Sequence, residues 1–215
     1  MNTLNGSRPT LAAGAVIALA LCAVQAIADD GLEPVNVPGF DHAFIIAGNP
    51  LAGYDKLFVD QVKVDFAKGW PPKTFGHDVR PADVERIREK VATAFRREFV
   101  RTLKRSRFAV VGEPGAGVLR VTANIQDLYL NAPYVIYPGR TTSYARSIGK
   151  MTLNAELRDS LNNKLLSRAI DEREDPDTDR FEPITDVQNL ARVAQFAERW
   201  AHALRGQLDV ARVKR

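Results

Sequence analysis

The sequence has few of the residue types on which thiol chemistry and metal binding depend. It contains one cysteine, Cys22, and three histidines among 215 residues. A single cysteine excludes an intramolecular disulfide, a thiolate metal cluster and a Cys-x-x-Cys redox motif. The histidines His42, His77 and His202 lack a metal-binding spacing such as His-x-x-x-His, which favours structural or surface roles for them.

Sequence motifs for common enzyme reactions are also missing. The sequence has no Gly-x-Ser-x-Gly motif, which carries the nucleophilic serine of many hydrolases. Residues 113–117 lack the Gly-Lys-Ser/Thr ending of a phosphate-binding loop. Residues 175–179 alternate carboxylates as a calcium loop does, but Pro176 interrupts them and Arg180 stands where glycine makes the sharp bend. We therefore predict no enzyme activity, no cofactor and no metal site. The alternative is a hydrolase whose residues converge only in the fold.

The one long apolar run lies at the N-terminus. Arg8 is the only charged side chain among the first ten residues, and residues 11–24 are uncharged and rich in leucine, alanine and valine. This pattern is typical of a signal peptide covering residues 1–28. Small side chains at Ala26 and Ala28 predict cleavage between Ala28 and Asp29. About 14 apolar residues are too few for the roughly 20 of a membrane-spanning helix.

The alternative is a lipoprotein anchored to a membrane through Cys22. Leu21 precedes this cysteine where lipoprotein processing prefers a small residue, and apolar residues follow where a polar tether is expected. We therefore expect a cleaved protein of the periplasm. Loss of Arg8 with the leader lowers the formal net charge from +4 to +3. No later stretch is apolar and long enough to cross a bilayer, so we expect no transmembrane segment after cleavage.

The remaining chain has the length of one domain. Residues 29–53 hold prolines and glycines with little periodicity, which predicts an irregular lead-in or tether. We expect a single domain over residues 54–210 and a basic C-terminal tail over residues 211–215.

Hydrophobic periodicity within this domain predicts the α+β class. Apolar residues that alternate with polar ones indicate strands, and we expect the last two strands to form a hairpin. Apolar residues that recur three or four positions apart indicate two helices. The predicted strands cover residues 56–66, 108–111, 118–130, 151–157 and 165–170, and the helices cover residues 80–105 and 187–208. The order β-α-β-β-β-β-α predicts a single mixed sheet with both helices packed on one face. Phe95 and Trp200 lie on the apolar helix faces, so we expect them in one core.

One face of the first predicted helix carries positive charge. At 100° per residue, Arg86, Lys90, Arg97, Arg101 and Lys104 form a basic stripe beside the apolar face. An ordinary solvated helix face explains such a stripe. The functional alternative is contact with an anionic envelope surface or an envelope protein, and we expect no nucleic acid in that compartment.

Four short parts of the sequence carry a family resemblance. They are Tyr54-Asp55-Lys56-Leu57-Phe58-Val59-Asp60, Glu113-Pro114-Gly115 with Val118-Leu119-Arg120-Val121, Glu156-Leu157-Arg158-Asp159, and Trp200-Ala201. By their order and spacing, residues 54–208 resemble the domain of unknown function 3313 family of bacterial exported proteins and lipoproteins. The resemblance implies an envelope protein without assigned catalytic residues. We expect an exported, non-catalytic protein that binds an envelope partner or surface.

Overall fold

The computed structural model describes residues 31–71, 80–130, 143–145, 149–175, 182–184 and 186–213. The predicted signal peptide, Cys22, His77 and the predicted tail beyond residue 213 lie outside these residues. The chain from Leu32 onward forms one compact unit. Neither described helix is long and apolar enough to cross a membrane.

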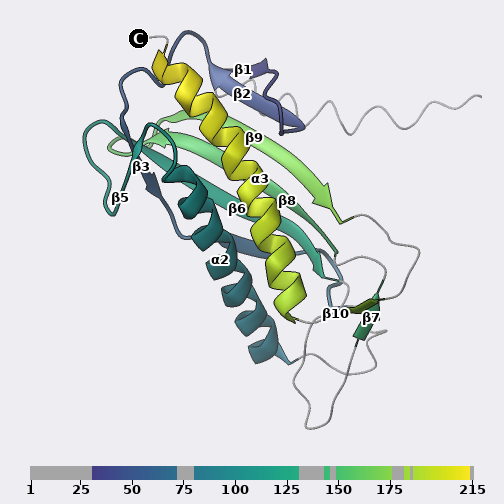
Figure 1. The fold of residues 1–215 in the computed structure, drawn as a ribbon. Helices are drawn as coiled ribbons and strands as arrows, with labels where there is room; N and C mark the ends of the chain where they lie inside the picture. The colour runs from purple at the N-terminus through teal and green to yellow at the C-terminus, as the bar shows by residue number, and fades with distance from the viewer. Residues whose placement is uncertain are drawn as a thin grey trace, which may run out of the picture. The chain divides into compact units, whose positions relative to one another are not determined.

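The unit is built from one large mixed sheet and two long helices (Figure 1). The eight-stranded sheet has the order β1-β2-β9-β8-β6-β3-β5, with β4 also paired to β6, and β7 and β10 form a separate two-stranded sheet. The strands are β1 (Leu32–Val35), β2 (His42–Ile46), β3 (Lys56–Val59), β4 (Lys63–Phe66), β5 (Ala109–Val111), β6 (Val118–Leu130), β7 (Ser143–Ala145), β8 (Gly149–Asp159), β9 (Leu165–Glu174) and β10 (Glu182–Ile184). The helices are α2 (Pro81–Leu103) and α3 (Asp186–Val213).

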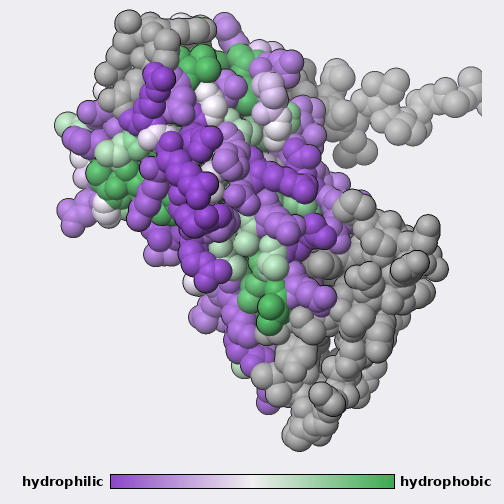
Figure 2. Space-filling model, in the orientation of Figure 1, coloured by the Kyte–Doolittle hydropathy of each residue, from purple (hydrophilic) through white to green (hydrophobic). Residues whose placement is uncertain are grey.

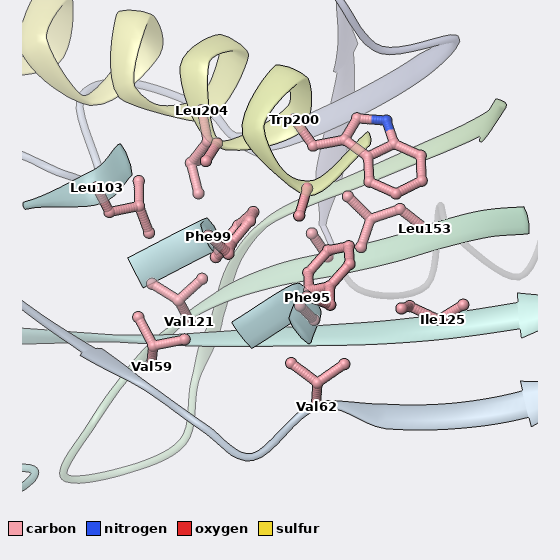
Figure 3. Close-up of a cluster of buried hydrophobic side chains, with 14 of the residues drawn as sticks. Val59, Val62, Phe95, Phe99, Leu103, Val121, Ile125, Leu153, Trp200 and Leu204 are labelled. Carbon is pink, nitrogen blue, oxygen red and sulfur yellow. The ribbon is translucent and has the colours of Figure 1, made fainter. Parts of the chain in front are cut away.

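The two helices lie side by side over the same face of the sheet, as the sequence predicts (Figure 1). The ring centroids of Phe95 and Trp200 are 5.9 Å apart, and both side chains are fully buried. Figure 3 shows Phe95 and Trp200 above Val121 and Ile125, which point up from β6. The prediction of a shared core for the two aromatic residues is therefore confirmed. Burial of aromatic rings across a helix pair and a sheet supplies a large apolar contribution to stability.

The predicted hairpin is also confirmed, because β8 and β9 pair antiparallel. Its turn depends on Asp159, whose Oδ1 accepts hydrogen bonds from the backbone N–H groups of Leu161 and Asn162 at 2.9 Å each. The Tyr54 hydroxyl donates to Asp159 Oδ2 at 2.7 Å. These bonds lower the pKa of Asp159, the bond from Asn162 most of all, and burial together with Asp159 raises the pKa of Tyr54 to about 12.

The irregular lead-in predicted for residues 29–53 is wrong. Instead, β1 and β2 form an antiparallel pair that extends the sheet, with β2 paired to β9. A Cβ added at Gly39, in the turn between them, would lie 2.8 Å from the Ala203 side chain of α3. The Arg173 guanidinium donates to the Gly39 carbonyl at 3.1 Å. Pro34 hid this strand from sequence analysis, since proline is tolerated in a strand only at a sheet edge such as β1.

The single strand predicted over residues 56–66 is instead two strands. Both β3 and β4 pair with β6 in parallel, at successive positions along it, and the chain leaves the ladder between them. Arg96 of α2 donates to the carbonyls of Val59 and Asp60 at 3.0 and 3.1 Å. A helix side chain thus donates to backbone carbonyls at the point where the strand is interrupted, and buried backbone groups require such partners.

A buried carboxylate joins the helix layer to the sheet. Asp171 of β9 is fully buried, and the Trp200 indole N–H donates to its Oδ2 at 2.7 Å. Arg173 Nε lies 2.5 Å from the same oxygen without the alignment of a hydrogen bond. Burial raises the pKa of Asp171, and the Trp200 hydrogen bond opposes that rise. Asp171 is therefore held by a neutral donor and a partly exposed cation.

Candidate functional site

The sheet face opposite the helices is polar. Along β6, Leu119, Val121 and Ala123 are buried under the helices, whereas the alternate residues Arg120 and Thr122 are half-buried on the other face. We call this second surface the open face, because neither described helix covers it (Figure 1). It is made of residues from β4, β6, β8 and β9 and from the segments that follow β3 and β8.

The open face places like charges opposite each other. Arg120 of β6 stands in register with Arg158 of β8. Two arginines directly across a strand pair destabilise a sheet unless other charges offset them. Asp60, which follows β3, accepts a hydrogen bond from Arg120 Nε at 2.7 Å, and this contact raises the pKa of Arg120. The carboxylate comes from a segment 60 residues away in the sequence.

Glu156 offsets the second arginine and holds a third. Its Oε2 accepts from Arg158 Nε at 2.8 Å, and its Oε1 accepts from Arg168 Nη2 of β9 at 2.8 Å. Only 14 % of the Glu156 side chain is exposed, so the two guanidinium groups are fixed at the surface by a largely buried anion. Arg158 also donates to the Asn163 carbonyl in the hairpin turn at 2.9 Å.

Polar atoms between these charges have hydrogen-bonding capacity that the described residues do not use. Thr122 Oγ1 and Asn154 Oδ1 are buried and find no partner in the described part of the chain. Thr122 lies on β6 in register with Glu156. A depression of about 460 Å³ opens over this surface, lined by Thr122, Asn124, Glu156 and both register-paired arginines. Buried polar atoms without a partner are uncommon in folded proteins.

Three of the four segments that carry the family resemblance meet at this surface. The segment at residues 54–60 supplies Asp60, the segment at 118–121 supplies Arg120, and the segment at 156–159 supplies Glu156 and Arg158. Residues of the same segments also hold each other in place, since Tyr54 binds Asp159. Sequence analysis missed this convergence, because the pairing of β3 and β8 on either side of β6 is not visible in the sequence.

The basic stripe of α2 lies on the opposite side of the molecule. Figure 2 shows the surface over α2 and α3 mostly as hydrophilic residues. Lys90, Arg97 and Lys104 are exposed there. Two arginines of the stripe form ion pairs on the helices: Arg86 pairs with Asp83 at 2.8 Å, and Arg101 pairs with Glu98 and with Glu198 of α3. These acids reduce the net charge of the stripe, and its role in surface contact stays a prediction.

The histidines, the calcium-like stretch and Ser160 lie where the structure gives them no arrangement typical of a catalytic or metal site among the described residues. His42 is exposed at the start of β2, and His202 Nε2 lies 3.8 Å from Glu198 Oε1 on α3. Asp175, the first residue of the calcium-like stretch, pairs with Arg192 Nε at 2.8 Å, and residues 176–179 lie outside the described residues. The Ser160 hydroxyl donates to the carbonyl of Gly115 at 2.8 Å. Among the described residues, no group of histidine, cysteine and acidic side chains is placed to hold a metal ion.

Several solved structures show a weak likeness to this chain. A PelC dodecamer from Paraburkholderia phytofirmans shares 10 % identity at a TM-score of 0.33, covering 78 % of this chain and 94 % of that one. Protein XCC0632 from Xanthomonas campestris shares 15 % identity at a TM-score of 0.40, covering 76 % and 88 %. A neuraminyllactose-binding hemagglutinin homolog from Helicobacter pylori shares 10 % identity at a TM-score of 0.40, covering 84 % and 95 %. These scores are too low to carry any conclusion about function.

The family comparison is more informative than the structural one. No curated protein matches this chain. A sequence model of the family described as "Protein of unknown function (DUF3313)" matches residues 24–204. The match begins before β1 and therefore includes the two strands that sequence analysis assigned to a lead-in. Because it covers most of the sequence, this chain belongs to the domain of unknown function 3313 family.

Proposed function

We propose that this protein is a non-catalytic binding protein of the cell envelope and that a partner docks on the open face. The observation that carries the proposal is the charge arrangement around Arg120 and Arg158. The sheet tolerates two arginines in register only because Asp60 and Glu156 offset them. Departures from locally favourable design are expected at functional sites, where another requirement outweighs stability.

The chemistry of the open face fits recognition of an acidic, hydrogen-bonding partner. Guanidinium groups bind carboxylates and phosphates in two-pronged geometry, and salt bridges to Asp60 and Glu156 pre-orient them. Thr122 and Asn124 line the same depression as the two arginines. A surface that is already ordered loses less side-chain entropy when a partner binds.

The surroundings of Ser160 and Ser167 also favour binding over hydrolysis. Ser160 and Ser167 use their hydroxyls to donate to backbone carbonyls at 2.8 Å each. Neither has a histidine as its hydrogen-bond partner, whereas a hydroxyl nucleophile needs an adjacent base. The proposal of an envelope location rests on the leader-like pattern of residues 1–28, with cleavage after Ala28.

Site-specific photo-crosslinking in living cells tests this proposal. A photoreactive amino acid replaces Asn124 on the open face in one variant, and Arg97 on the exposed face of α2 in a matched control. We expect discrete adducts from position 124 and none of the same mass from position 97. Adducts at position 97 alone would move the docking site to the basic stripe, and an absence of adducts at both positions would contradict the proposal.

A charge exchange separates loss of binding from loss of folding. Asp60→Arg combined with Arg120→Asp keeps an ion pair at the same place but reverses its polarity. The thermal stability of this double variant should stay close to that of the natural protein, because the pair is retained. We expect the position-124 adduct to fall at least about tenfold, since the partner then meets a reversed field. Unchanged crosslinking in a folded double variant would refute docking through this pair.

A further inference from the structure

A pocket of about 220 Å³ lies between the sheet and the C-terminal part of α3, on the side of the sheet opposite the open face. Strands β2, β8 and β9 form its floor, and α3 forms its roof. Its sides are closed by β1 and by the segments before and after β2. The pocket therefore lies where the β1–β2 pair, which sequence analysis took for a lead-in, meets the last helix.

A row of small side chains leaves the space for this pocket. Four alanines stand in register across β6, β8, β9 and β2, namely Ala123, Ala155, Ala169 and Ala43. Ala123 and Ala155 are buried, so the space above them is filled. Ala169 is half-buried and lines the pocket together with Ala43. Because protein interiors are otherwise close-packed and an empty apolar hollow lowers stability, the outer end of this row is room that no described residue fills.

The lining excludes a charged group inside the pocket. None of the residues that line it has an ionisable side chain. The Ser167 hydroxyl, one of three polar side chains in the lining, already donates to the Phe44 carbonyl at 2.8 Å. A charge moved into such surroundings would lose its hydration without compensation. The part of a ligand that enters must therefore be hydrocarbon.

The size of the pocket indicates a short chain. Apolar cavities of about 150 Å³ bind benzene, so this pocket has room for more than a single ring. At about 30 Å³ per group, the share of one water molecule in the liquid, 220 Å³ holds roughly seven methylene-sized groups. This is too little space for both chains of a phospholipid or for a peptide helix.

The mouth of the pocket offers hydrogen bonds but no charge. Asn49 is exposed and Gln207 is half-buried, which places their amides where the pocket meets solvent. Beside them, Val35 and Val210 line the pocket and are 38 % and 52 % exposed, although valine is usually buried. Figure 2 shows hydrophobic residues between the C-terminal end of α3 and β1. An amide both donates and accepts hydrogen bonds, so the two amides match an uncharged polar group such as a hydroxyl or an ester.

We propose that this pocket binds the hydrocarbon chain of an uncharged medium-chain lipid, with a hydroxyl or ester end placed at Asn49 and Gln207. The apolar lining matches the chain, the volume matches about seven carbons, and the two amides match the polar end. This inference is independent of docking on the open face, because the two sites share no lining residue.

Calorimetric titration of the protein isolated from its own cells with straight-chain alcohols tests the ligand class. 1-Octanol should bind at one saturable site about fifteenfold more tightly than 1-hexanol, since each buried methylene contributes about fourfold. 1-Decanol should gain little over 1-octanol, because the pocket is then full. Octanoate and octylammonium should both bind at least about tenfold more weakly than 1-octanol, since no lining side chain offsets either charge.

Three results of these titrations would overturn the proposal. The first is an absence of saturable 1-octanol binding. The second is a steady gain in affinity through 1-decanol and 1-dodecanol, because a closed pocket limits the chain length. The third is tighter binding of octanoate or octylammonium than of 1-octanol, because the polar end would then carry a charge.

A larger side chain on the floor should shorten the chain that the pocket accepts. Ala169→Leu adds three carbon groups, which take about 90 Å³ of the space at the same volume per group. We expect the affinity for 1-octanol to fall at least about tenfold, and the gain with chain length to stop near 1-pentanol. The Tm of the ligand-free variant should stay equal or rise, since the added groups fill a hollow.

An exposed alanine of α3 supplies the matched control. Ala191 lines no part of the pocket, so Ala191→Leu should leave both the affinity and the limiting chain length unchanged. An unchanged limiting length in folded Ala169→Leu would refute this site, and so would equal effects of the two variants. A dimer of the natural protein that Val210→Glu dissociates would also refute it, because a second copy would then cover the pocket.

Discussion

The hydrogen bond between Trp200 and Asp171 offers the most quantitative test of how the two layers are joined. Trp200→Phe keeps an aromatic ring but removes the indole N–H that lies 2.7 Å from the buried carboxylate. A hydrogen bond to a charged group contributes about 1.5–3 kcal/mol. The smaller ring adds about 1 kcal/mol for lost apolar contact. We therefore expect the free energy of unfolding to fall by about 2.5–4 kcal/mol, within the 5–15 kcal/mol of a typical domain.

The loss of stability caused by Trp200→Phe should depend on pH in a defined direction. Burial already raises the pKa of Asp171, so the folded state keeps this proton at pH values where the unfolded chain has lost it. The contribution of Asp171 to stability therefore falls as the pH rises through the folded pKa. Because the Trp200 bond opposes the shift, its removal raises the pKa further. The destabilisation by Trp200→Phe should thus be larger at about pH 8 than at about pH 5.

Urea denaturation in two backgrounds measures this effect. In an Asp171→Asn background the acceptor is a neutral amide, so Trp200→Phe should cost only about 1.5–2.5 kcal/mol, with little dependence on pH. The midpoint and slope of each transition give the free energies, and the four proteins form a double-mutant cycle. A cost that is the same in both backgrounds and at both pH values would refute the role assigned to this hydrogen bond.

Three further predictions concern other parts of the chain. Gly149→Ala should lower Tm by about 10 °C or more in a thermal melt, because the new Cβ would lie 1.9 Å from a backbone oxygen of β6 at a φ of +142°. Arg97→Glu with Arg101→Glu should reduce sedimentation with anionic vesicles at low salt if the basic stripe is a docking face, and equal pelleting would leave it a solvated helix face. Intact-mass measurement should give Asp29 as the mature N-terminus, whereas a lipid-modified mass would contradict soluble export.

The elements that sequence analysis predicted well are those with long, regular periodicity. The first helix was expected over residues 80–105 and is found at Pro81–Leu103. The hairpin of β8 and β9 follows from two alternating runs around a polar turn. Shared burial of Phe95 and Trp200 follows because two amphipathic helices needed the same sheet surface. For the helix, the hairpin and the shared core, the local sequence pattern was sufficient for a correct prediction.

The elements that sequence analysis missed depend on contacts between residues far apart in the sequence. β1 and β2 are short, and their burial comes from β9 and α3, more than 100 residues later. The division between β3 and β4 depends on Arg96 reaching back to strand carbonyls. Short strands carry too few residues for a periodic signal, so tertiary partners decide whether they form.

By itself the sequence determined the α+β class, the two helices, the central hairpin and the family, because these follow from local periodicity and ordered short segments. Only the tertiary structure decided which side chains share a surface. Asp60, Arg120 and Glu156 are scattered along the chain, and parallel pairing of β3 with β6 and antiparallel pairing of β8 with β6 bring them onto one face. Strand register and sheet order are collective properties of the packed chain, and they are absent from any local pattern.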